Sequence, residues 1–417
     1  MAGAPKLLTP RVAIVGGGPA GLSAAARLAR LVEGEVLVLD REREAGGIPR
    51  HADHPGYGIR DRKRFLSGPA YARLLVKDAL EAGANISTQT TVTGWEDEAT
   101  LVATRPRGRL LIRPEVFLFA TGARERPRAA RMIPGDRPAG IFTTGQLQNL
   151  VHLHGARVGK RAVVVGAELV SWSAVMTLRE SGCATEALVS RYPKAESYWA
   201  FRAPGSLAFR TRVVANSRVV AVHGRPRVSG VEIEHLSTGQ RTILACDTVI
   251  FTGDWVADNE LLRAGGIEID PASSAPVVDT ALCTSRPDVF AVGNLTHPVE
   301  TADVVALEGR FVADRIAARL GSAPPPADGV RVRARDPLRW ISPGRVGARS
   351  GPPARRRFVA WVDRFVASPT VRISQDGRTL ASRRLLWPAA PGRAFRIPAD
   401  LLDGVDPHGG EVSVWLE

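Results

Sequence analysis

A run of apolar residues that leads into three glycines near the N-terminus constrains the fold of this chain more than any other feature. Residues 12–15, Val-Ala-Ile-Val, favour a β-strand, and the segment Gly-Gly-Gly-Pro-Ala-Gly follows directly. An alanine-rich helical stretch at 22–31 comes next, and a second apolar segment ends in Asp40. This succession of strand, glycine-rich turn, helix, strand and acid predicts a βαβ unit that binds a dinucleotide.

Each position of this turn has a physical role in holding a pyrophosphate. Gly16 permits the tight turn, Gly18 lets the backbone approach the phosphates, and Gly21 lets the helix pack closely on the strand. The N-terminus of the helix offers free N–H groups and the positive end of its dipole to the phosphates. The cofactor-binding residues predicted in this unit are Gly16, Gly18, Pro19, Ala20, Gly21, Asp40, whose carboxylate suits a ribose diol, and Arg41.

Size and composition predict a globular protein of several domains. The chain has 417 residues, of which 44% are hydrophobic, so it can bury a sizeable core. No run of about 18 apolar residues is present, so we expect no membrane span. The first ten residues lack the charged-then-apolar order of a secretory signal, and Cys183, Cys246 and Cys283 are scattered. We therefore expect a cytoplasmic protein in a reducing compartment, without a disulfide framework.

The formal net charge of +14 is strongly basic, but its distribution argues against a nucleic-acid-binding protein. Residues 331–417 hold sixteen arginines and eight acidic residues, and only Arg355-Arg356-Arg357 forms a tight cluster. The other arginines are spread through a chain rich in alanine, proline and glycine. This pattern favours a solvated basic surface, with docking of an acidic partner protein as the alternative.

A second nucleotide-like unit begins 150 residues after the first. Residues 161–166, Arg-Ala-Val-Val-Val-Gly, repeat the strand-then-glycine start, and a helix is expected over 169–180. Two apolar segments that end in Thr-Gly, at 116–122 and 248–253, flank this unit. They are typical of paired crossings between two nucleotide-binding domains, so we predict two Rossmann-like domains.

The pattern changes after residues 322–328, which are rich in proline and alanine and predict a linker. The alternation around Asp376-Gly377 predicts a β-hairpin, and residues 412–416 predict a last strand. Four tryptophans in this part (Trp340, Trp361, Trp387 and Trp415) are expected to fill a small β core, with base stacking as the alternative. The predicted organisation is α/β, with a discontinuous dinucleotide-binding domain over 8–123 and 251–321, a second Rossmann-like domain over 124–250, a linker over 322–330 and a basic β-rich domain over 331–417.

The order of these motifs resembles a known family. The first fingerprint, an Ala-Thr-Gly strand end, the second glycine turn and Phe-Ala-Val-Gly-Asn at 290–294 are similar to the FAD-dependent pyridine nucleotide-disulfide oxidoreductases, and the spacing is closest to the thioredoxin-reductase-like branch. Residues 45–51 and 294–302 are more narrowly similar to flavoprotein subunits of hydrogen cyanide synthase, opine oxidase and related amine-oxidising complexes. The resemblance covers about residues 8–320.

The resemblance implies FAD as the cofactor. In the wider family the late motif ends in Gly-Asp, whose carboxylate bonds the flavin's ribityl chain, whereas here Asn294 stands at that place. The helix that follows would direct its N-terminal N–H groups at the flavin's pyrimidine edge, although Thr301 can also serve as a structural helix cap. The further cofactor-binding residues that the resemblance implies are Gly47, Ile48, Thr121, Gly122, Gly293, Asn294, Thr301 and Ala302.

The second glycine turn departs from the family's pattern. Aligned on Gly166, the second glycine position holds Glu168 and the third holds Ser171. A carboxylate that faces a pyrophosphate repels it unless it is neutralised. The strand after this turn ends in Arg191, which can meet a 2′-phosphate, and no acid for a ribose diol follows. NAD(P)H binding and a Rossmann shell kept for packing both remain open.

The cysteines exclude two kinds of redox chemistry. No Cys-x-x-Cys is present, so the dithiol chemistry of thioredoxin reductase is excluded for this chain. The related amine-oxidising subunits often carry a cysteine-ligated iron–sulfur module near the C-terminus, but no cysteine follows Cys283 here. We predict no metal site, and any iron–sulfur cluster that the reaction needs must come from another subunit.

Candidate proton-transfer groups follow Asp40 and the late motif. The loop at 46–58 is expected to run beside the flavin ring, and it contains His51, His54 and Tyr57. A histidine there can act as a general base toward an amine or alcohol, or only bond the backbone of an irregular loop. His297 is the fourth candidate, with Glu300 expected to orient it, and packing is the alternative.

Taken together, these features predict an FAD-dependent oxidoreductase that moves two electrons as hydride. The donor would be a small molecule, either NAD(P)H or the C–N bond of an amine or amino acid. The alternative is a flavin-binding electron-transfer subunit without independent turnover, in a complex with an acidic or iron–sulfur partner protein. A homo-oligomer or a hetero-complex is expected.

Overall fold

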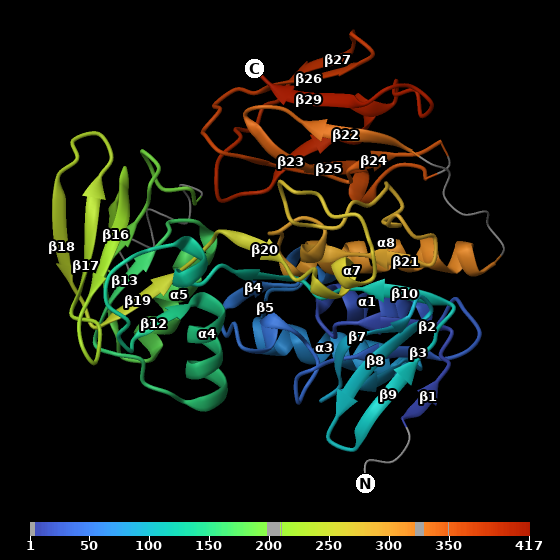
Figure 1. The fold of residues 1–417 in the computed structure, drawn as a ribbon, viewed down its shortest axis with the longest axis horizontal. Helices are drawn as coiled ribbons and strands as arrows, with labels where there is room; N and C mark the ends of the chain where they lie inside the picture. Colours follow the sequence, from blue (N-terminus) through green and yellow to red (C-terminus); the bar gives the residue numbers. More distant parts are fainter. Residues whose placement is uncertain (1–4, 198–208, 210, 322–328, 349) are drawn as a thin grey trace.

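The computed structural model describes residues 5–197, 209, 211–321, 329–348 and 350–417. Two sheet-based units lie side by side, and a smaller β unit lies above them in the view of Figure 1. We call residues 5–125 and 255–321 the first unit, 126–254 the second unit, and 329–417 the C-terminal unit.

The first unit is built on a five-stranded parallel sheet. The glycine-rich turn leaves its central strand, and the neighbouring strands are apolar and buried on both faces, as parallel sheets require. In spatial order the strands are β21 (Val289–Ala291), β10 (Val116–Phe119), β2 (Val12–Val15), β3 (Val36–Leu39) and β6 (Asn85–Ser87).

Helices and a second sheet cover this parallel sheet (Figure 1). Trp95 of the second sheet packs its ring 5.0 Å from that of Phe117 in β10, which closes one face of the core. The helices are α1 (Pro19–Leu28), α2 (Ile59–Arg62), α3 (Gly68–Glu81), α7 (Glu260–Ala264) and α8 (Ala302–Leu320). The second sheet comprises β1 (Lys6–Leu8), β9 (Gly108–Ile112), β8 (Thr100–Arg105) and β7 (Thr91–Asp97), and β4 (Pro55–Tyr57) pairs with β5 (Leu66–Ser67) at one side.

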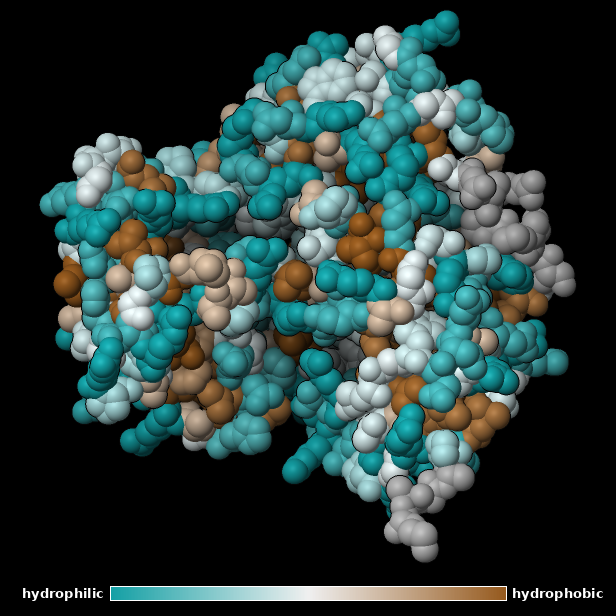
Figure 2. All heavy atoms as spheres, in the orientation of Figure 1, coloured by the Kyte–Doolittle hydropathy of each residue, from teal (hydrophilic) through white to brown (hydrophobic). Residues whose placement is uncertain are grey.

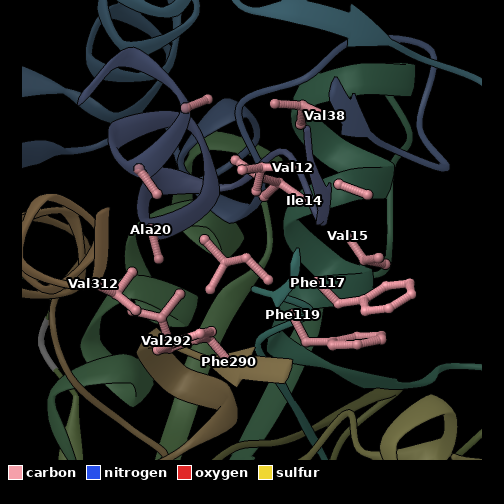
Figure 3. Packing of buried hydrophobic residues seen from close by; sticks show 14 of the residues in the cluster. Val12, Ile14, Val15, Ala20, Val38, Phe117, Phe119, Phe290, Val292 and Val312 are labelled. Carbon is pink, nitrogen blue, oxygen red and sulfur yellow. The ribbon is translucent and has the colours of Figure 1, made fainter. Parts of the chain in front are cut away.

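The apolar core lies directly beneath the glycine-rich turn. Figure 3 shows Val12 and Ile14 of β2 on the side of Ala20 of α1 and Val312 of α8, and all four are at most 6% exposed. The rings of Phe117 and Phe119 point to the other face of the sheet, toward Trp95. The turn is therefore fixed from below by packing, while its upper side is left for a ligand.

Two crossings join the first unit to the second. The chain leaves through β11 (Ala123–Glu125) and returns through β20 (Trp255–Ala257), and these strands pair antiparallel. Each follows an apolar strand that ends in Thr-Gly, so the predicted paired crossings are present.

The second unit repeats the parallel architecture and adds an antiparallel sheet. Its helices are α4 (Thr144–Gln148), a π-helical turn (Asn149–Leu153) and α5 (Leu169–Glu180), which has the bounds expected from sequence. The parallel strands, in order, are β12 (Ile141–Thr143), β19 (Thr248–Phe251), β13 (Arg161–Val165), β14 (Ala184–Val189) and β15 (Arg212–Val214). The added strands are β16 (Ser217–His223), β17 (Gly230–His235) and β18 (Arg241–Ala245).

The C-terminal unit consists of two packed sheets, as its alternating sequence predicts. The predicted hairpin pairs β26 with β27, and the last strand, β29, has the expected bounds. One sheet is β24 (Arg345–Val346), β22 (Val330–Ala334), β29 (Val412–Leu416), β26 (Thr370–Gln375) and β27 (Arg378–Arg384), and the other is β23 (Leu338–Ser342), β25 (Arg357–Val362) and β28 (Phe395–Pro398). Most of the predicted linker lies outside the described residues.

The prediction that tryptophans fill this β core is wrong. The buried cluster between the two sheets is made of aliphatic residues and phenylalanines, such as Val371, Ile373 and Phe358. Trp340 stacks on Trp361 at a ring distance of 5.9 Å, and Trp387 is 39% exposed. Branched aliphatic side chains fill the narrow space between two short sheets. Trp340, 7% exposed, is buried outside this cluster, and the other three tryptophans are half-buried or exposed.

The C-terminal unit is docked on the first unit by specific polar contacts. The Ser350 hydroxyl donates to Asp279 at 2.6 Å, and the Gly344 N–H donates to the Val278 carbonyl at 3.0 Å. Figure 2 shows that the surface around these units is mostly hydrophilic, with apolar residues in small separate groups.

Candidate functional site

The first cradle, which we define as residues 16–21 with the N-terminus of α1, has the geometry that a pyrophosphate needs. Gly16 has φ +110°, and a Cβ atom there would lie 2.5 Å from the Ala120 carbonyl oxygen. A Cβ on Gly21 would lie 2.0 Å from the Gly16 oxygen, whereas one on Gly18 would meet nothing closer than 3.9 Å. Gly16 and Gly21 are thus required by packing, and Gly18 faces the open space in which a ligand fits.

The N-terminus of α1 leaves its backbone donors available. Gly18 is the N-cap, no side chain caps the helix, and its first turn holds Pro19 and Ala20 but no acid. Free N–H groups at a helix N-terminus attract anions. These residues therefore fit the diphosphate of FAD.

The two predicted parts of the cofactor site are brought together by close backbone contact. A Cβ on Gly309 of α8 would lie 2.1 Å from the Ala20 carbonyl oxygen, and one on Gly293 would lie 3.0 Å from the Ala20 Cβ. The late glycine motif therefore lies against the first cradle, although 272 positions separate Gly21 from Gly293 in the chain.

Asp40 ends β3 as predicted, and its carboxylate also braces the cradle. Its Oδ2 accepts from the Gly17 N–H at 2.8 Å, and its Oδ1 accepts from the Glu42 N–H at 2.8 Å. Burial raises the pKa of Asp40, against the lowering effect of these two N–H groups. The ribose contact remains a prediction.

Asp258, which sequence analysis missed, links three predicted cofactor residues. The Thr121 hydroxyl donates to the Asp258 carbonyl at 2.8 Å, and the Arg41 guanidinium lies 3.8 Å from the Asp258 carboxylate. The Asp258 N–H donates to the Gly122 carbonyl at 2.9 Å. Nothing in the sequence around Asp258 signals this link, because it joins three separate loops.

The loop that follows Asp40 touches the cradle. The Gly46 N–H donates to the Gly17 carbonyl at 2.7 Å, and a Cβ on Gly47 would lie 2.8 Å from the Gly18 Cα. Ile48 follows, and it is 55% exposed beside the cradle. An exposed apolar side chain at this place is suited to packing against an aromatic ring system.

The structure brings His54 and Tyr57 together, and His51 lies in the same loop. The His54 and Tyr57 rings lie 5.3 Å apart, and His54 Nδ1 is 2.9 Å from the Pro55 carbonyl. His51 is 7% exposed, and its Nδ1 has no partner among the described residues. Burial lowers the pKa of His51 to about 4 and also lowers that of His54, so both imidazoles are neutral at pH 7. Burial raises the pKa of Tyr57.

His152 joins this group from the second unit. It lies on the π-helical turn, its Nε2 is 3.2 Å from the Thr177 hydroxyl and 3.6 Å from the Glu180 carboxylate, and it lowers the pKa values of both His51 and His54. Sequence analysis gave it no role. The π-helical turn that orients it has no recognisable sequence pattern, which is why the residue was missed.

Asn294 fixes the loop that leads into α8. Its Oδ1 accepts from the Glu300 N–H at 2.8 Å, and its Nδ2 donates to the Glu300 carbonyl at 3.2 Å. Only an amide can accept and donate in this way, which explains why an aspartate would not serve as well in this loop. A contact to the ribityl chain remains a prediction.

His297 is enclosed between α8 and the C-terminal unit. It is 3% exposed, and its Nε2 is 2.9 Å from the carboxylate of Glu308. Burial by itself would lower the pKa of His297, but the charge and hydrogen bond of Glu308 raise it. The expected partner, Glu300, instead pairs with Arg396 of β28 at 2.6 and 2.9 Å. This placement favours the packing alternative for His297.

The N-terminus of α8 carries a buried acid. Asp303 accepts from the Arg60 N–H at 2.9 Å, and its pKa is lowered, because Thr301 and Arg60 outweigh the opposing effect of burial. Thr301 occupies the N-cap position but makes no side-chain cap, since its hydroxyl bonds to Asp303. The idea that its side chain caps the helix is therefore wrong. Ala302 is the first helical residue.

A carboxylate fills the second cradle, which we define as residues 166–171 with the N-terminus of α5. Glu168 is 5% exposed, and a Cβ on Gly166 or on Gly253 would lie 2.7 Å from its carboxylate oxygens. The carboxylate therefore stands over the ends of β13 and β19. Its Oε1 has no hydrogen-bond partner among the described residues. Arg191, the predicted 2′-phosphate contact, donates to the Tyr192 hydroxyl at 2.9 Å.

Two more buried acids surround Glu168. The pKa of Glu125 and that of Glu196 are each raised to about 7. Burial is the main cause, and the negative charge of Glu168 contributes to both. Both acids therefore hold their protons more tightly in the folded chain than in the unfolded one.

Removing the Glu168 charge should stabilise the protein at high pH. The folded-state pKa values of Glu125 and Glu196 lie above the unfolded value. The stabilisation that this difference gives is therefore fully present below about pH 4.5 and is lost as the pH rises to about 7. We expect Glu168→Gln to raise the free energy of unfolding by about 1 kcal/mol at pH 8 and by less at pH 5. Urea unfolding at both pH values measures this, with Glu33→Gln as the control because Glu33 is exposed in the loop after α1. Equal gains at both pH values would contradict the charge argument.

The comparisons with known proteins agree with this geometry. The family model described as "Pyridine nucleotide-disulphide oxidoreductase" matches residues 10–309. The chain belongs to this family. Its members are flavin-dependent oxidoreductases, so the predicted enzyme class and the FAD cofactor are confirmed.

Individual relatives place the chain within the family. It is 27% identical over 295 residues to the thioredoxin reductase of Treponema pallidum (strain Nichols), covering 68% of this chain and 88% of that protein. It is 32% identical over 186 residues to the sarcosine oxidase subunit alpha of Corynebacterium sp. (strain P-1), covering 41% of this chain but only 18% of that subunit. The solved thioredoxin reductase of T. acidophilum, 20% identical, matches the fold with a TM-score of 0.63 over 75% of this chain and 99% of that one.

This pyridine nucleotide-disulphide oxidoreductase does not use the thiols that give the family its name. All three cysteines are free and buried, and burial raises the pKa of Cys183 to about 12 and that of Cys246 to about 11. A thiol in that state is a poor nucleophile. Within the described ranges no group of three or more His, Cys, Asp or Glu side chains is arranged to hold a metal ion, and no helix there is long and apolar enough to cross a membrane.

Proposed function

We propose that this flavoenzyme oxidises a C–N bond in a small amine or amino acid, rather than NAD(P)H. The observation that carries the proposal is the buried Glu168 carboxylate in the second cradle, where a dinucleotide would place its pyrophosphate. Two negative groups about 4 Å apart repel each other by about 4 kcal/mol near a protein surface. The match to a subunit named for sarcosine oxidase supports a C–N substrate.

The first cradle and the late motif would hold the cofactor. Bound FAD would supply the hydride acceptor. The oxidation of an amine also releases a proton from nitrogen, and the neutral imidazoles of His51 and His54 are placed in the loop beside the first cradle to accept it. His51 is buried and His54 is half-buried. Tyr57 stays protonated and so can donate a hydrogen bond.

Anaerobic reduction of the purified holoenzyme tests the proposed function. A panel of secondary amines and amino acids should bleach the visible flavin absorbance, whereas NADH and NADPH should not. Rapid bleaching by NADPH, with none by any amine, would refute the proposal. His54→Gln should slow the reduction roughly 10²-fold, because a general base contributes about that factor. His408→Gln, an exposed histidine in the C-terminal unit, is the matched control and should leave the rate unchanged.

A second candidate function is that of an electron-transferring subunit in a larger complex. The C-terminal unit exposes 96% of Leu386 and 39% of Trp387, next to Arg383 and Arg384 on a strongly basic unit. A partly apolar, basic surface suits an acidic partner protein. Steady turnover of the isolated chain with an amine and an artificial acceptor would argue against this function, and reduction without turnover would support it.

A further inference from the structure

A loop of the C-terminal unit lies directly on the second cradle. A Cβ atom built on Gly392 would stand 3.0 Å from the Glu168 Cβ and 2.8 Å from the Glu196 Cβ. Side-chain atoms do not approach each other so closely, so only a glycine backbone fits there. The contact joins residues more than 190 positions apart in the chain. It puts the backbone of the C-terminal unit where a dinucleotide would approach α5.

The cradle is also closed from within the second unit. The Ser197 N–H donates to the Ala167 carbonyl at 3.0 Å, and the Trp172 indole N–H donates to the Ser197 hydroxyl at 3.1 Å. The segment at 195–197 therefore crosses over the start of α5. The Ser190 hydroxyl donates to Glu196 at 2.9 Å and holds this segment in place.

Phe365 of the C-terminal unit contacts the chain just before residues 195–197. The Lys194 ammonium lies 4.5 Å from the centre of the Phe365 ring, and the Tyr192 ring meets that ring edge-on at 6.1 Å. A cation over an aromatic face is attracted by the negative face of the ring. Phe365 and Gly392 thus hold the segment at two points.

We propose that the C-terminal unit is a built-in cover of the second cradle, and that Glu168 and Gly392 together determine that the enzyme rejects dinucleotides. Glu168 repels the pyrophosphate by charge, and the backbone at Gly392 fills space from which it would approach the N–H groups of α5. Removing the charge alone does not open the cradle, because the backbone at Gly392 remains in place. The inference rests on the proposed function, in which a small organic donor makes a second nucleotide site unnecessary.

Binding and amide exchange of the intact holoenzyme test the cover. We expect no heat of binding in calorimetry when NADPH or NADH is added to millimolar concentration to the wild-type protein or to Glu168→Gly. Gly392→Trp should force the loop away, so that backbone amides at 166–172 exchange hydrogen roughly tenfold faster while those at 16–22 stay unchanged. Phe365→Ala loosens the same cover without a bulky side chain and should act in the same direction.

Each outcome decides for or against the cover. Micromolar binding of NADPH by the wild-type protein would overturn the proposal, and so would such binding by Glu168→Gly, since charge alone would then control access. Unchanged exchange at 166–172 in both cover variants would also overturn it. A protein that no amine reduces but that still rejects NADPH would refute the proposed function and leave the cover standing, so the two failures are distinguishable.

Discussion

Gly18→Asp is expected to give a well-folded protein that is purified without its yellow colour. A Cβ at Gly18 has room, since the nearest atom is 3.9 Å away. An aspartate at the N-cap of α1 accepts hydrogen bonds from the first turn and stabilises the helix by about 1 kcal/mol. The same carboxylate would stand where the FAD diphosphate binds, at a repulsion of about 4 kcal/mol, which corresponds to roughly a 10³-fold loss of affinity.

Two measurements check this prediction. The ratio of flavin to protein absorbance reports the loss of the cofactor, and the thermal unfolding of the flavin-free protein reports the stability of the fold. Gly94→Ala is the matched control, because Gly94 also has open space around it and lies on β7, away from the first cradle. A Gly18→Asp protein that retains stoichiometric FAD would place the cofactor elsewhere. The chain itself carries a carboxylate at the matching position of the second cradle, where Glu168 stands.

Local patterns predicted most of the elements of the first and second units. The helix at 169–180 and the strand at 412–416 have the expected bounds, because neighbouring residues determine their apolar periodicity and their ends. The first cradle was predictable for the same reason. Gly16 and Gly21 are required by contacts with the adjacent strand and turn, and Gly18 leaves space for a ligand.

Contacts between distant segments were not predictable from one sequence. Glu308 was overlooked as the partner of His297, because the hydrogen bond depends on how the loop at 294–300 folds back onto α8. The approach of Gly392 to Glu168 joins two separately folded units and leaves no periodic signal. The tryptophan prediction failed for a related reason, since composition does not tell which large residues fit between two short sheets.

The same distinction explains where the structure places the candidate histidines. His51 and His54 share one loop with Tyr57, so their grouping was visible in the sequence, and the loop's contact with the first cradle supports their proposed role. His297 is also close in sequence to a cofactor motif. Its side chain, however, is turned into the interface with the C-terminal unit, so sequence proximity alone misplaces it.

His297→Ala is expected to destabilise the protein without slowing flavin reduction. The variant leaves the Glu308 carboxylate buried without its partner, which costs about 3–5 kcal/mol in comparable buried pairs. The folded-state pKa of His297 is raised, so the stabilisation by the pair is fully present below the unfolded value of 6.5 and is lost as the pH rises through the folded value. The difference in unfolding free energy between wild type and variant should therefore be largest in mildly acidic solution.

Two experiments separate a structural role of His297 from a catalytic one. They are denaturant unfolding at a series of pH values and anaerobic flavin reduction by an amine at neutral pH. Glu308→Gln keeps a neutral hydrogen bond to the imidazole, so it should lose less stability than His297→Ala and most of its pH dependence. His408→Ala, at the exposed end of the C-terminal unit, should change neither quantity. If His297→Ala kept its stability but reduced flavin roughly 10²-fold more slowly, His297 would be a general base, and the enclosed pair with Glu308 would have to open during the reaction.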